Sequence, residues 1–232
     1  MTKPARHNED APNLPVLYSF RRCPYAMRSR MAILYAGVTV ELRDILLKDK
    51  PAEMVEVSPK ATVPVLLLPG GTVLEESLDI MRWAFSENDP AHRLPEEGPV
   101  RQDIFDLIAE NDGPFKRALD HYKYHVRFPE KSREAYRMEG EEFLKKLEDR
   151  LVNSPYLTGA EMSFADMAIF PFIRQFANSD RAWFDAAPYP LLHGWLDKFL
   201  SSDDFANVMK KRPLWQEGTK GTPFPEEAAD GR

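Results

Sequence analysis

The chain has a single cysteine, and the residues around it favour reactivity. Cys23 stands directly before Pro24, and proline is common at the first position of a helix, so Cys23 is predicted to be the N-cap. Its sulfur would then face unpaired backbone N–H groups and the positive end of the helix dipole. Four arginines lie in the same segment: Arg21, Arg22, Arg28 and Arg30. One guanidinium at about 5 Å and an effective dielectric of about 20 stabilises a thiolate by on the order of 3 kcal/mol, which predicts a nucleophile.

The alternative for Cys23 is a structural role, because a lone cysteine usually packs as a small buried hydrophobe. A core cysteine rarely sits among four arginines and before a proline, so the reactive interpretation is favoured. One cysteine also excludes a disulfide within the chain, which is typical of proteins in the reducing cytoplasm.

The composition argues against several other classes of function. A net charge of -6 disfavours nucleic-acid binding, which needs a basic surface that neutralises phosphates. No apolar stretch approaches the roughly 18 residues of a membrane span. Residues 1–13 are polar, lack the apolar core of a secretory signal and are expected to be flexible. His121 and His125 share a helix face without an evident third ligand, so no metal site is expected.

The elements that would position Cys23 follow the order βαβαββα within residues 14–88. A short apolar run predicts a strand over 14–20, and apolar residues at helical spacing predict a helix over 24–36. Alternating residues predict a strand over 38–43. A short helix over 51–57, a hairpin with strands over 65–68 and 72–74, and a helix over 76–85 complete this part.

Beyond a polar, proline-containing linker at 89–98, helical patterns predict an all-α bundle over 99–209. A kink is expected at Gly113-Pro114. Ser163 and Asp166 form a capping-box pattern before an apolar run, which predicts a helix at the centre of this bundle. A last helix is expected over 191–209, and the tail over 210–232 is expected to be irregular.

Three motifs and the helical part that follows them occur in the order and spacing of one known family. The motifs are Cys23-Pro24-Tyr25-Ala26 opening a helix, Thr62-Val63-Pro64-Val65 before a strand, and Glu76-Ser77 opening the next helix. From about residue 14 to residue 205 the chain resembles a cytosolic glutathione transferase. A cysteine in place of tyrosine or serine makes it most similar to the omega class and its bacterial relatives. The resemblance implies an α/β thioredoxin-like N-terminal domain, an all-α C-terminal bundle, glutathione as co-substrate and a homodimer.

The resemblance also implies roles for Cys23, Val63 and Pro64. Cys23 would attack a disulfide or an oxidised carbon centre and form a mixed disulfide with glutathione. A second glutathione would resolve it, because Ala26 replaces the second cysteine of glutaredoxins. Pro64 is expected to be cis, so that the Val63 backbone pairs with glutathione as an added strand would. The alternative is an ordinary proline that begins a strand.

The charged ends of glutathione have expected partners as well. Ser77 would hold the γ-glutamyl carboxylate at a helix N-terminus and Glu76 would take its ammonium, although both residues also fit plain helix capping. Lys50, in Asp49-Lys50-Pro51, falls where the omega class carries a lysine for the glycine carboxylate; otherwise it is a solvated lysine. Tyr25 either contacts the ligand or packs under the helix.

A polar and aromatic cluster is a candidate for the second substrate. Its members are His121, Tyr122, Tyr124 and His125, on a helix that faces the open site in this family. An aromatic stripe on a helix is more often part of a core, so both interpretations stay open. Trp183 and Trp215 are further candidates for the same cleft.

The function that follows is a cytoplasmic glutathione-dependent thiol transferase. Removal of glutathione from mixed disulfides, and reduction of dehydroascorbate or of α-glutathionyl ketones, are favoured over conjugation, because a cysteine thiolate near the ligand sulfur forms a disulfide. One alternative is a binding module like the stringent starvation protein, which binds RNA polymerase without glutathione catalysis. A relative of the membrane-inserting chloride channel proteins is disfavoured, because Arg28 and Arg30 lie in the segment that would insert and central charges cost about 2.5 kcal/mol or more each.

Overall fold

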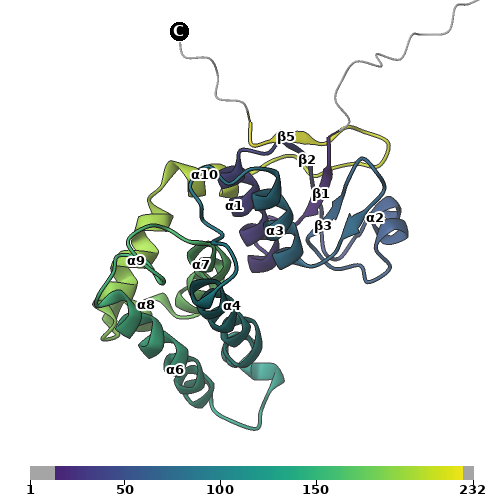
Figure 1. The fold of residues 1–232 in the computed structure, drawn as a ribbon. Helices are drawn as coiled ribbons and strands as arrows, with labels where there is room; N and C mark the ends of the chain where they lie inside the picture. The colour runs from purple at the N-terminus through teal and green to yellow at the C-terminus, as the bar shows by residue number, and fades with distance from the viewer. Residues whose placement is uncertain (1–13, 227–232) are drawn as a thin grey trace, which may run out of the picture.

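The computed structural model describes residues 14–226; the expected flexible segment 1–13 lies outside them. Figure 1 shows a sheet with its helices on one side of the molecule and a bundle of longer helices on the other. The expected fold, a thioredoxin-like α/β part followed by an all-α part, is confirmed. The predicted element order βαβαββα is likewise found.

The sheet has five strands in the order β4-β3-β1-β2-β5. Strand β1 pairs in parallel with β2, and in antiparallel fashion with β3. The two outer pairs, β3 with β4 and β2 with β5, are antiparallel. The strands are β1 (Val16–Ser19), β2 (Val40–Asp44), β3 (Val65–Leu67), β4 (Val73–Leu74) and β5 (Thr222–Phe224).

Three helices belong to the sheet: α1 (Pro24–Ala36), α2 (Ala52–Val57) and α3 (Ser77–Glu87). Helix α1 connects the parallel strands β1 and β2, as such a crossover requires. It ends at Gly37, whose φ of 66° is a left-handed conformation that favours glycine. Helices α1 and α3 pack against each other, and α1 also contacts α7 and α10 of the bundle. Helix α1 is therefore shared by the two parts.

The bundle contains seven α-helices among the described residues. They are α4 (Pro99–Glu110), α5 (Lys116–Lys123), α6 (Arg133–Leu151), α7 (Phe164–Ala177), α8 (Arg181–Ala186), α9 (Pro190–Leu200) and α10 (Asp203–Met209). The single helix predicted over 191–209 is wrong. It is divided at Ser202, which caps α10 by accepting a hydrogen bond from the Phe205 N–H. Serine competes with a helix in this way because its side chain bonds the backbone.

The expected kink at Gly113-Pro114 is a π-helical turn, η1 (Asn111–Phe115), between α4 and α5. Proline removes a helical hydrogen bond, and the wider turn accommodates the loss without ending the helix. A short 3-10 turn, η2 (His125–Arg127), follows α5.

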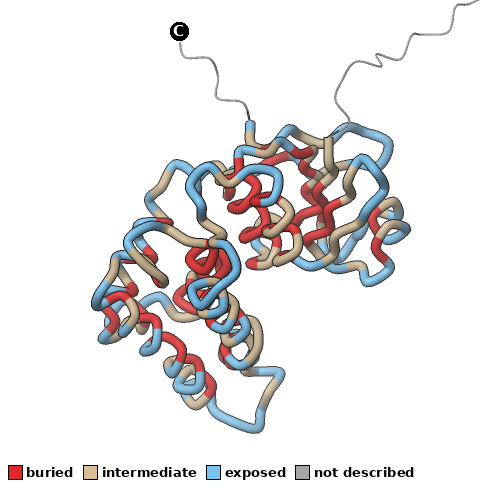
Figure 2. The backbone as a smooth tube through the Cα atoms, in the orientation of Figure 1, coloured by how far each residue is buried: buried red, intermediate tan, exposed pale blue. Residues whose placement is uncertain are grey.

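Helix α7 is central to the bundle, as predicted. Its capping box of Ser163 and Asp166 is present. Asp166 also accepts hydrogen bonds from the Leu157 N–H at 2.9 Å and from Trp195 Nε1 at 2.8 Å. Figure 2 shows the buried chain concentrated in α7, in α1 and in the middle of the sheet. This carboxylate therefore joins α7, α9 and the loop before α7 in one core.

The tail is not irregular throughout, which corrects the prediction for 210–232. Strand β5 pairs with β2, and Phe224 is fully buried. The chain approaches β2 closely at Gly221, where a Cβ atom would lie 2.5 Å from the Leu42 carbonyl oxygen. The strand is only three residues long and contains Pro223, which edge strands tolerate. No strand pattern was therefore visible in the sequence.

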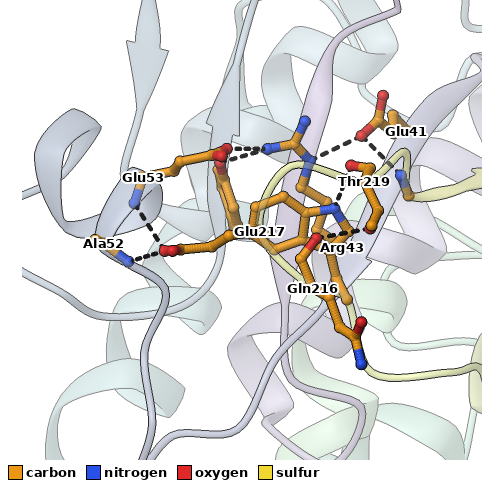
Figure 3. A network of polar contacts seen from close by, with 10 residues as sticks. Glu41, Arg43, Ala52, Glu53, Gln216, Glu217 and Thr219 are labelled. Atoms are coloured by element: carbon orange, nitrogen blue, oxygen red, sulfur yellow. Dashed lines mark hydrogen bonds and ion pairs between the residues drawn. The ribbon is translucent and has the colours of Figure 1, made fainter.

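The C-terminal segment also binds to α2, as Figure 3 shows. The Glu217 carboxylate accepts hydrogen bonds from the first amides of α2, at Ala52 and Glu53. Trp215 lies over the Arg43 guanidinium, 4.2 Å from the ring centroid, and Arg43 donates to Glu53 at 2.9 Å. These contacts tie the C-terminal segment to both the sheet and α2.

Candidate active site around Cys23

Cys23 is the N-cap of α1, with Pro24 at the first helical position, as predicted. Its sulfur makes no capping bond to the helix. Sγ lies 3.8 Å from the Val63 carbonyl oxygen, and the residue is partly exposed. The thiol therefore stands at the surface between the start of α1 and the loop before β3.

The four neighbouring arginines do not surround the thiol as expected. Arg30 is buried and donates to the Val208 and Arg21 carbonyl oxygens at 3.2 and 2.6 Å. Burial lowers the pKa of Arg30, while Asp44 and then Cys23 act against this shift. Arg28 is also buried and points to other partners, whereas Arg22 is exposed. Helix geometry is the reason, because it directs residues 28 and 30 to different faces of α1.

A cavity of about 780 Å³ opens on one side of Cys23. It brings together every residue predicted to bind glutathione: Tyr25, Lys50, Val63, Pro64, Glu76 and Ser77. The predicted cis peptide bond between Val63 and Pro64 is confirmed. Four segments that are separate in sequence therefore meet in one concave site, which is the usual form of a small-molecule site.

Ser77, at the first position of α3, anchors a buried polar network. Arg28 Nε donates to Ser77 Oγ at 2.9 Å, and the two terminal nitrogens of Arg28 donate to the Asp112 carboxylate at 2.9 and 2.8 Å. The Arg28 side chain is 2% exposed and that of Asp112 is 24% exposed. Asp112 comes from the turn η1 and also lines the cavity. The bundle thus helps to fix the serine through a bidentate ion pair.

Sequence reasoning missed Asp112 and Lys60. Both line the cavity, and Lys60 forms an ion pair with Glu76 at its rim. Glu76 is the N-cap residue of α3, but its side chain makes no capping bond, so plain capping is not its role here. Lys50 is exposed and takes part in no ion pair within residues 14–226. A lysine directly after a serine-proline pair carries no recognisable signal, so Lys60 was not identifiable.

Tyr25 both packs and faces the site. Its ring meets Phe172 edge-on with centroids 4.9 Å apart, and it lines both cavities beside Cys23. Burial, reinforced by the Asp112 carboxylate, raises the pKa of Tyr25 to about 12. The hydroxyl is therefore protonated at physiological pH and is able to donate a hydrogen bond to a ligand.

A second cavity, of about 450 Å³, also has Cys23 in its wall. Its wall combines the start of α1 with α5 and one residue of α7. The lining residues are Phe20, Arg22, Cys23, Pro24, Tyr25, Leu47, Lys116, Asp120, Lys123, Tyr124 and Gln175. Cys23 thus lies at the boundary of two cavities.

Of the residues predicted for the second substrate, only Tyr124 lines this cavity. Tyr122 is 1% exposed and packs against Phe176 within the bundle. His121 stacks against Phe128 with centroids 4.2 Å apart, and His125 lies in the turn η2. The structure places these three outside both cavities, because consecutive helix positions point in different directions.

The two tryptophans also lie away from this cleft. Trp215 packs edge-on against Tyr18 of the sheet, and Trp183 packs against Phe176. Within residues 14–226 no group of three or more side chains is arranged to hold a metal ion. None of the helices in that range is long and apolar enough to cross a bilayer.

Comparisons with known proteins agree with this geometry. The glutathione S-transferase N-terminal domain model matches residues 17–92, and the C-terminal domain model matches residues 130–198. Maleylacetoacetate isomerase of Rattus norvegicus is 30% identical over 189 residues, covering 77% of this chain and 84% of the relative. The chain belongs to the glutathione S-transferase family.

Other relatives and solved structures are less similar to the chain in sequence. Glutathione S-transferase omega-1 of Sus scrofa is 26% identical over 165 residues, 68% of this chain and 66% of the relative. A glutathione transferase family member from Pseudomonas fluorescens, solved with two glutathione molecules bound, superposes with a TM-score of 0.74 at 20% identity, over 87% of this chain and 95% of that one. One from Methylobacillus flagellatus with glutathione bound gives 0.72 at 21%, over 84% and 98%. Such identities establish the shared fold alone.

Proposed function

We propose that the protein is a glutathione-dependent thiol transferase of omega-like type, with Cys23 as its nucleophile. The observation that carries the proposal is the position of the thiol, at a helix N-terminus and in the wall of both cavities. Glutathione in the first cavity and a second substrate in the other would meet at this sulfur. Family membership and the glutathione-bound neighbours support this choice of co-substrate.

The first cavity offers partners for each part of glutathione. Ser77, with the first amides of α3, holds the γ-glutamyl carboxylate at a helix N-terminus, and Glu76 takes the ammonium. The Val63 backbone pairs with the cysteinyl unit, which brings its sulfur toward Cys23. Lys50, which lines the same cavity, holds the glycine carboxylate.

The reaction is a pair of thiol–disulfide exchanges. The Cys23 thiolate attacks the glutathione sulfur of a mixed disulfide, the disulfide bond breaks, and the other half leaves as a thiolate that is protonated by solvent. A second glutathione thiolate then attacks the glutathione sulfur bound to Cys23. This step releases oxidised glutathione and regenerates the Cys23 thiolate, so one incoming glutathione is consumed and the disulfide bond passes from the substrate to oxidised glutathione.

Reduction is favoured over conjugation because of the sulfur itself. A hydroxyl at this position would only donate a hydrogen bond to the glutathione thiolate. A thiolate instead forms a covalent bond with the ligand sulfur. Candidate substrates are glutathione mixed disulfides, dehydroascorbate and α-glutathionyl ketones.

The substitution Cys23→Ser tests the proposal, since it keeps the size of the side chain and removes the sulfur. Thiol transfer to a mixed disulfide is expected to fall to background. Conjugation of glutathione to an aryl halide is expected to persist or rise, because a serine hydroxyl still stabilises the glutathione thiolate. Both activities are measured at matched glutathione saturation.

Intact-mass measurement provides the direct readout. Wild type incubated with oxidised glutathione should gain one glutathionyl group that dithiothreitol removes, and Cys23→Ser should gain none. Thiol transfer that survives in Cys23→Ser would overturn the proposal. The alternative of a module that binds RNA polymerase gains no support from the relatives described above, and retention on immobilised glutathione would oppose it further.

Two finer expectations accompany this function. The chemistry needs a reduced thiol, so we place the protein in a reducing compartment such as the cytoplasm. A homodimer, which the family resemblance implies, is expected in solution and is tested by sedimentation equilibrium.

A further inference from the structure

The second cavity is positively charged although the chain carries a net charge of -6. Its wall contains three cationic side chains, Arg22, Lys116 and Lys123, against the single carboxylate of Asp120. Charges of one sign in a concave wall concentrate oppositely charged solutes there. The sign of this wall is therefore opposite to that of the whole chain.

Two of these cations are free to meet a ligand. Lys116 forms an ion pair with Asp120 one helical turn away, so these two charges offset each other. Neither Arg22 nor Lys123 forms an ion pair with any residue of the described range, and both side chains are exposed. Arg22 belongs to the loop directly before Cys23, and Lys123 is the last residue of α5.

Aromatic rings accompany both free cations. The Arg22 guanidinium lies 5.7 Å from the ring centroid of Phe20, and the Lys123 ammonium lies 4.9 Å from that of Tyr124. The rings hold the charged ends near the cavity wall without neutralising them. With Leu47, they supply apolar surface between the two charges.

We propose that the second cavity selects an anionic partner, namely the carboxylate-bearing half of a glutathione mixed disulfide. This inference rests on the thiol transferase function proposed above and defines its substrate class. The carboxylate meets Arg22 and Lys123, and the carbon chain next to it lies against the apolar rings. The disulfide then spans from this cavity to the glutathione cavity, past Cys23.

The charge acts on the first exchange step. The Cys23 thiolate attacks the glutathione sulfur, the disulfide bond breaks, and the carboxylate-bearing half leaves from the second cavity as a thiolate. That half then carries two negative charges until solvent protonates its sulfur. The two free cations stabilise both the carboxylate and the thiolate charge, whereas a leaving group with a neutral end offers them only the thiolate.

A series of three mixed disulfides tests the proposal. Glutathione is joined to 3-mercaptopropionate, to 2-mercaptoethanol or to cysteamine, which differ mainly in a terminal carboxylate, hydroxyl or ammonium. Each kcat/KM is divided by the rate constant for uncatalysed exchange with glutathione, which corrects for leaving-group ability. Wild type is expected to prefer the carboxylate over the hydroxyl by about fivefold, and the ammonium is expected to be the poorest, as exposed ion pairs allow.

Charge removal should erase the preference. The double variant Arg22→Met with Lys123→Met is expected to bring the carboxylate-to-hydroxyl ratio to about one. Lys145→Met, on α6 and paired with Glu142, removes a positive charge elsewhere and should leave the ratio unchanged. In wild type the ratio should also fall in 0.5 M salt, because exposed charges are screened.

The outcomes separate this inference from the proposed function. Equal corrected rates for the three disulfides in wild type, or a preference that the double variant retains, would overturn the anionic selectivity while thiol transfer stands. Failure of wild type to turn over any of the three disulfides would overturn the proposed function. Circular dichroism of the double variant checks that the fold is intact.

Discussion

The two cavities beside Cys23 are built in different ways. In the first cavity, the polar side chains bind one another. The buried Arg28 donates a hydrogen bond to Ser77 and forms a bidentate ion pair with Asp112. In the second, Arg22 and Lys123 are exposed and lack an ion-pair partner in the described part of the chain. One wall is fixed before any ligand arrives, and the other is adjustable.

This difference matches two kinds of ligand. A site that always receives the same molecule gains affinity when its partners are preorganised, because less entropy is lost on binding. A site that receives varied partners is better served by long side chains on a solvated wall. The comparison therefore predicts that substitutions in the first cavity alter stability and glutathione affinity together, whereas those in the second alter substrate choice alone.

The largest effect is expected from Asp112→Ala, in the wall of the first cavity. It leaves the Arg28 guanidinium buried and unpaired, which should lower the free energy of unfolding by about 2–3 kcal/mol, somewhat less than for a fully buried pair. Glutathione affinity should fall as well, because Ser77 loses its fixed donor. Urea denaturation and calorimetry measure the two effects. Asp185→Ala, which breaks an exposed Arg181–Asp185 pair, is the control and should cost less than about 1 kcal/mol. If Asp112→Ala and Asp185→Ala lowered the free energy of unfolding by similar amounts, the structural role given to the Arg28–Asp112 pair would be wrong.

A smaller effect is expected from Ser77→Ala. The variant removes a hydroxyl that holds the ligand carboxylate and leaves Arg28 Nε without its acceptor. Glutathione affinity should fall by about 1–2 kcal/mol, or roughly fivefold to thirtyfold. Ser86→Ala, at the exposed end of the same helix, should bind glutathione like wild type. Unchanged affinity in Ser77→Ala would remove this serine from the site.

The second wall is tested by Tyr124→Ala. The KM for the mixed disulfide should rise by about twofold to fivefold as apolar contact is lost, and the KM for glutathione should stay constant. Val126→Ala, two residues along the chain and 80% exposed, should leave both constants unchanged. A parallel rise in both KM values in Tyr124→Ala would show that the two cavities are not independent.

The smallest effect is expected from Tyr25→Phe. The pKa of Tyr25 is raised to about 12, so the neutral form is favoured and the hydroxyl does not ionise between pH 7 and 10. The variant should therefore lower the rate by a constant factor, with a pH profile parallel to that of wild type. A change in the rate near pH 9 that is present in wild type and absent from Tyr25→Phe would show that burial does not raise the pKa of Tyr25.

The sequence predicted what depends on local chemistry. Cys23 before Pro24 defined a helix start, and Ser163 with Asp166 defined a capping box, and the structure has both. The family resemblance then brought the glutathione-binding candidates together, although each motif alone is weak.

Contacts between segments that are far apart in the chain could not be predicted from the sequence. Arg28 and Asp112 are 84 residues apart, and no pattern around either of them reveals the other. For this reason the sequence predicts that four arginines stabilise the Cys23 thiolate, although two of them are buried with other partners. The same limit hid strand β5, which exists only because β2 offers an unpaired edge.

Strand β5 has a consequence for the order in which the molecule is made. The Gly221 N–H donates to the Glu41 carboxylate, 180 residues earlier in the chain, so β5 can join the sheet only after that many further residues have been made. At about 5–20 residues per second, β2 waits roughly 10–35 s with an open edge. Glu41 and Arg43 alternate along that strand, and such charges discourage pairing with other nascent chains. Glu41, which accepts the hydrogen bond from Gly221 in the complete fold, thus also helps to keep other strands away from this edge before β5 arrives.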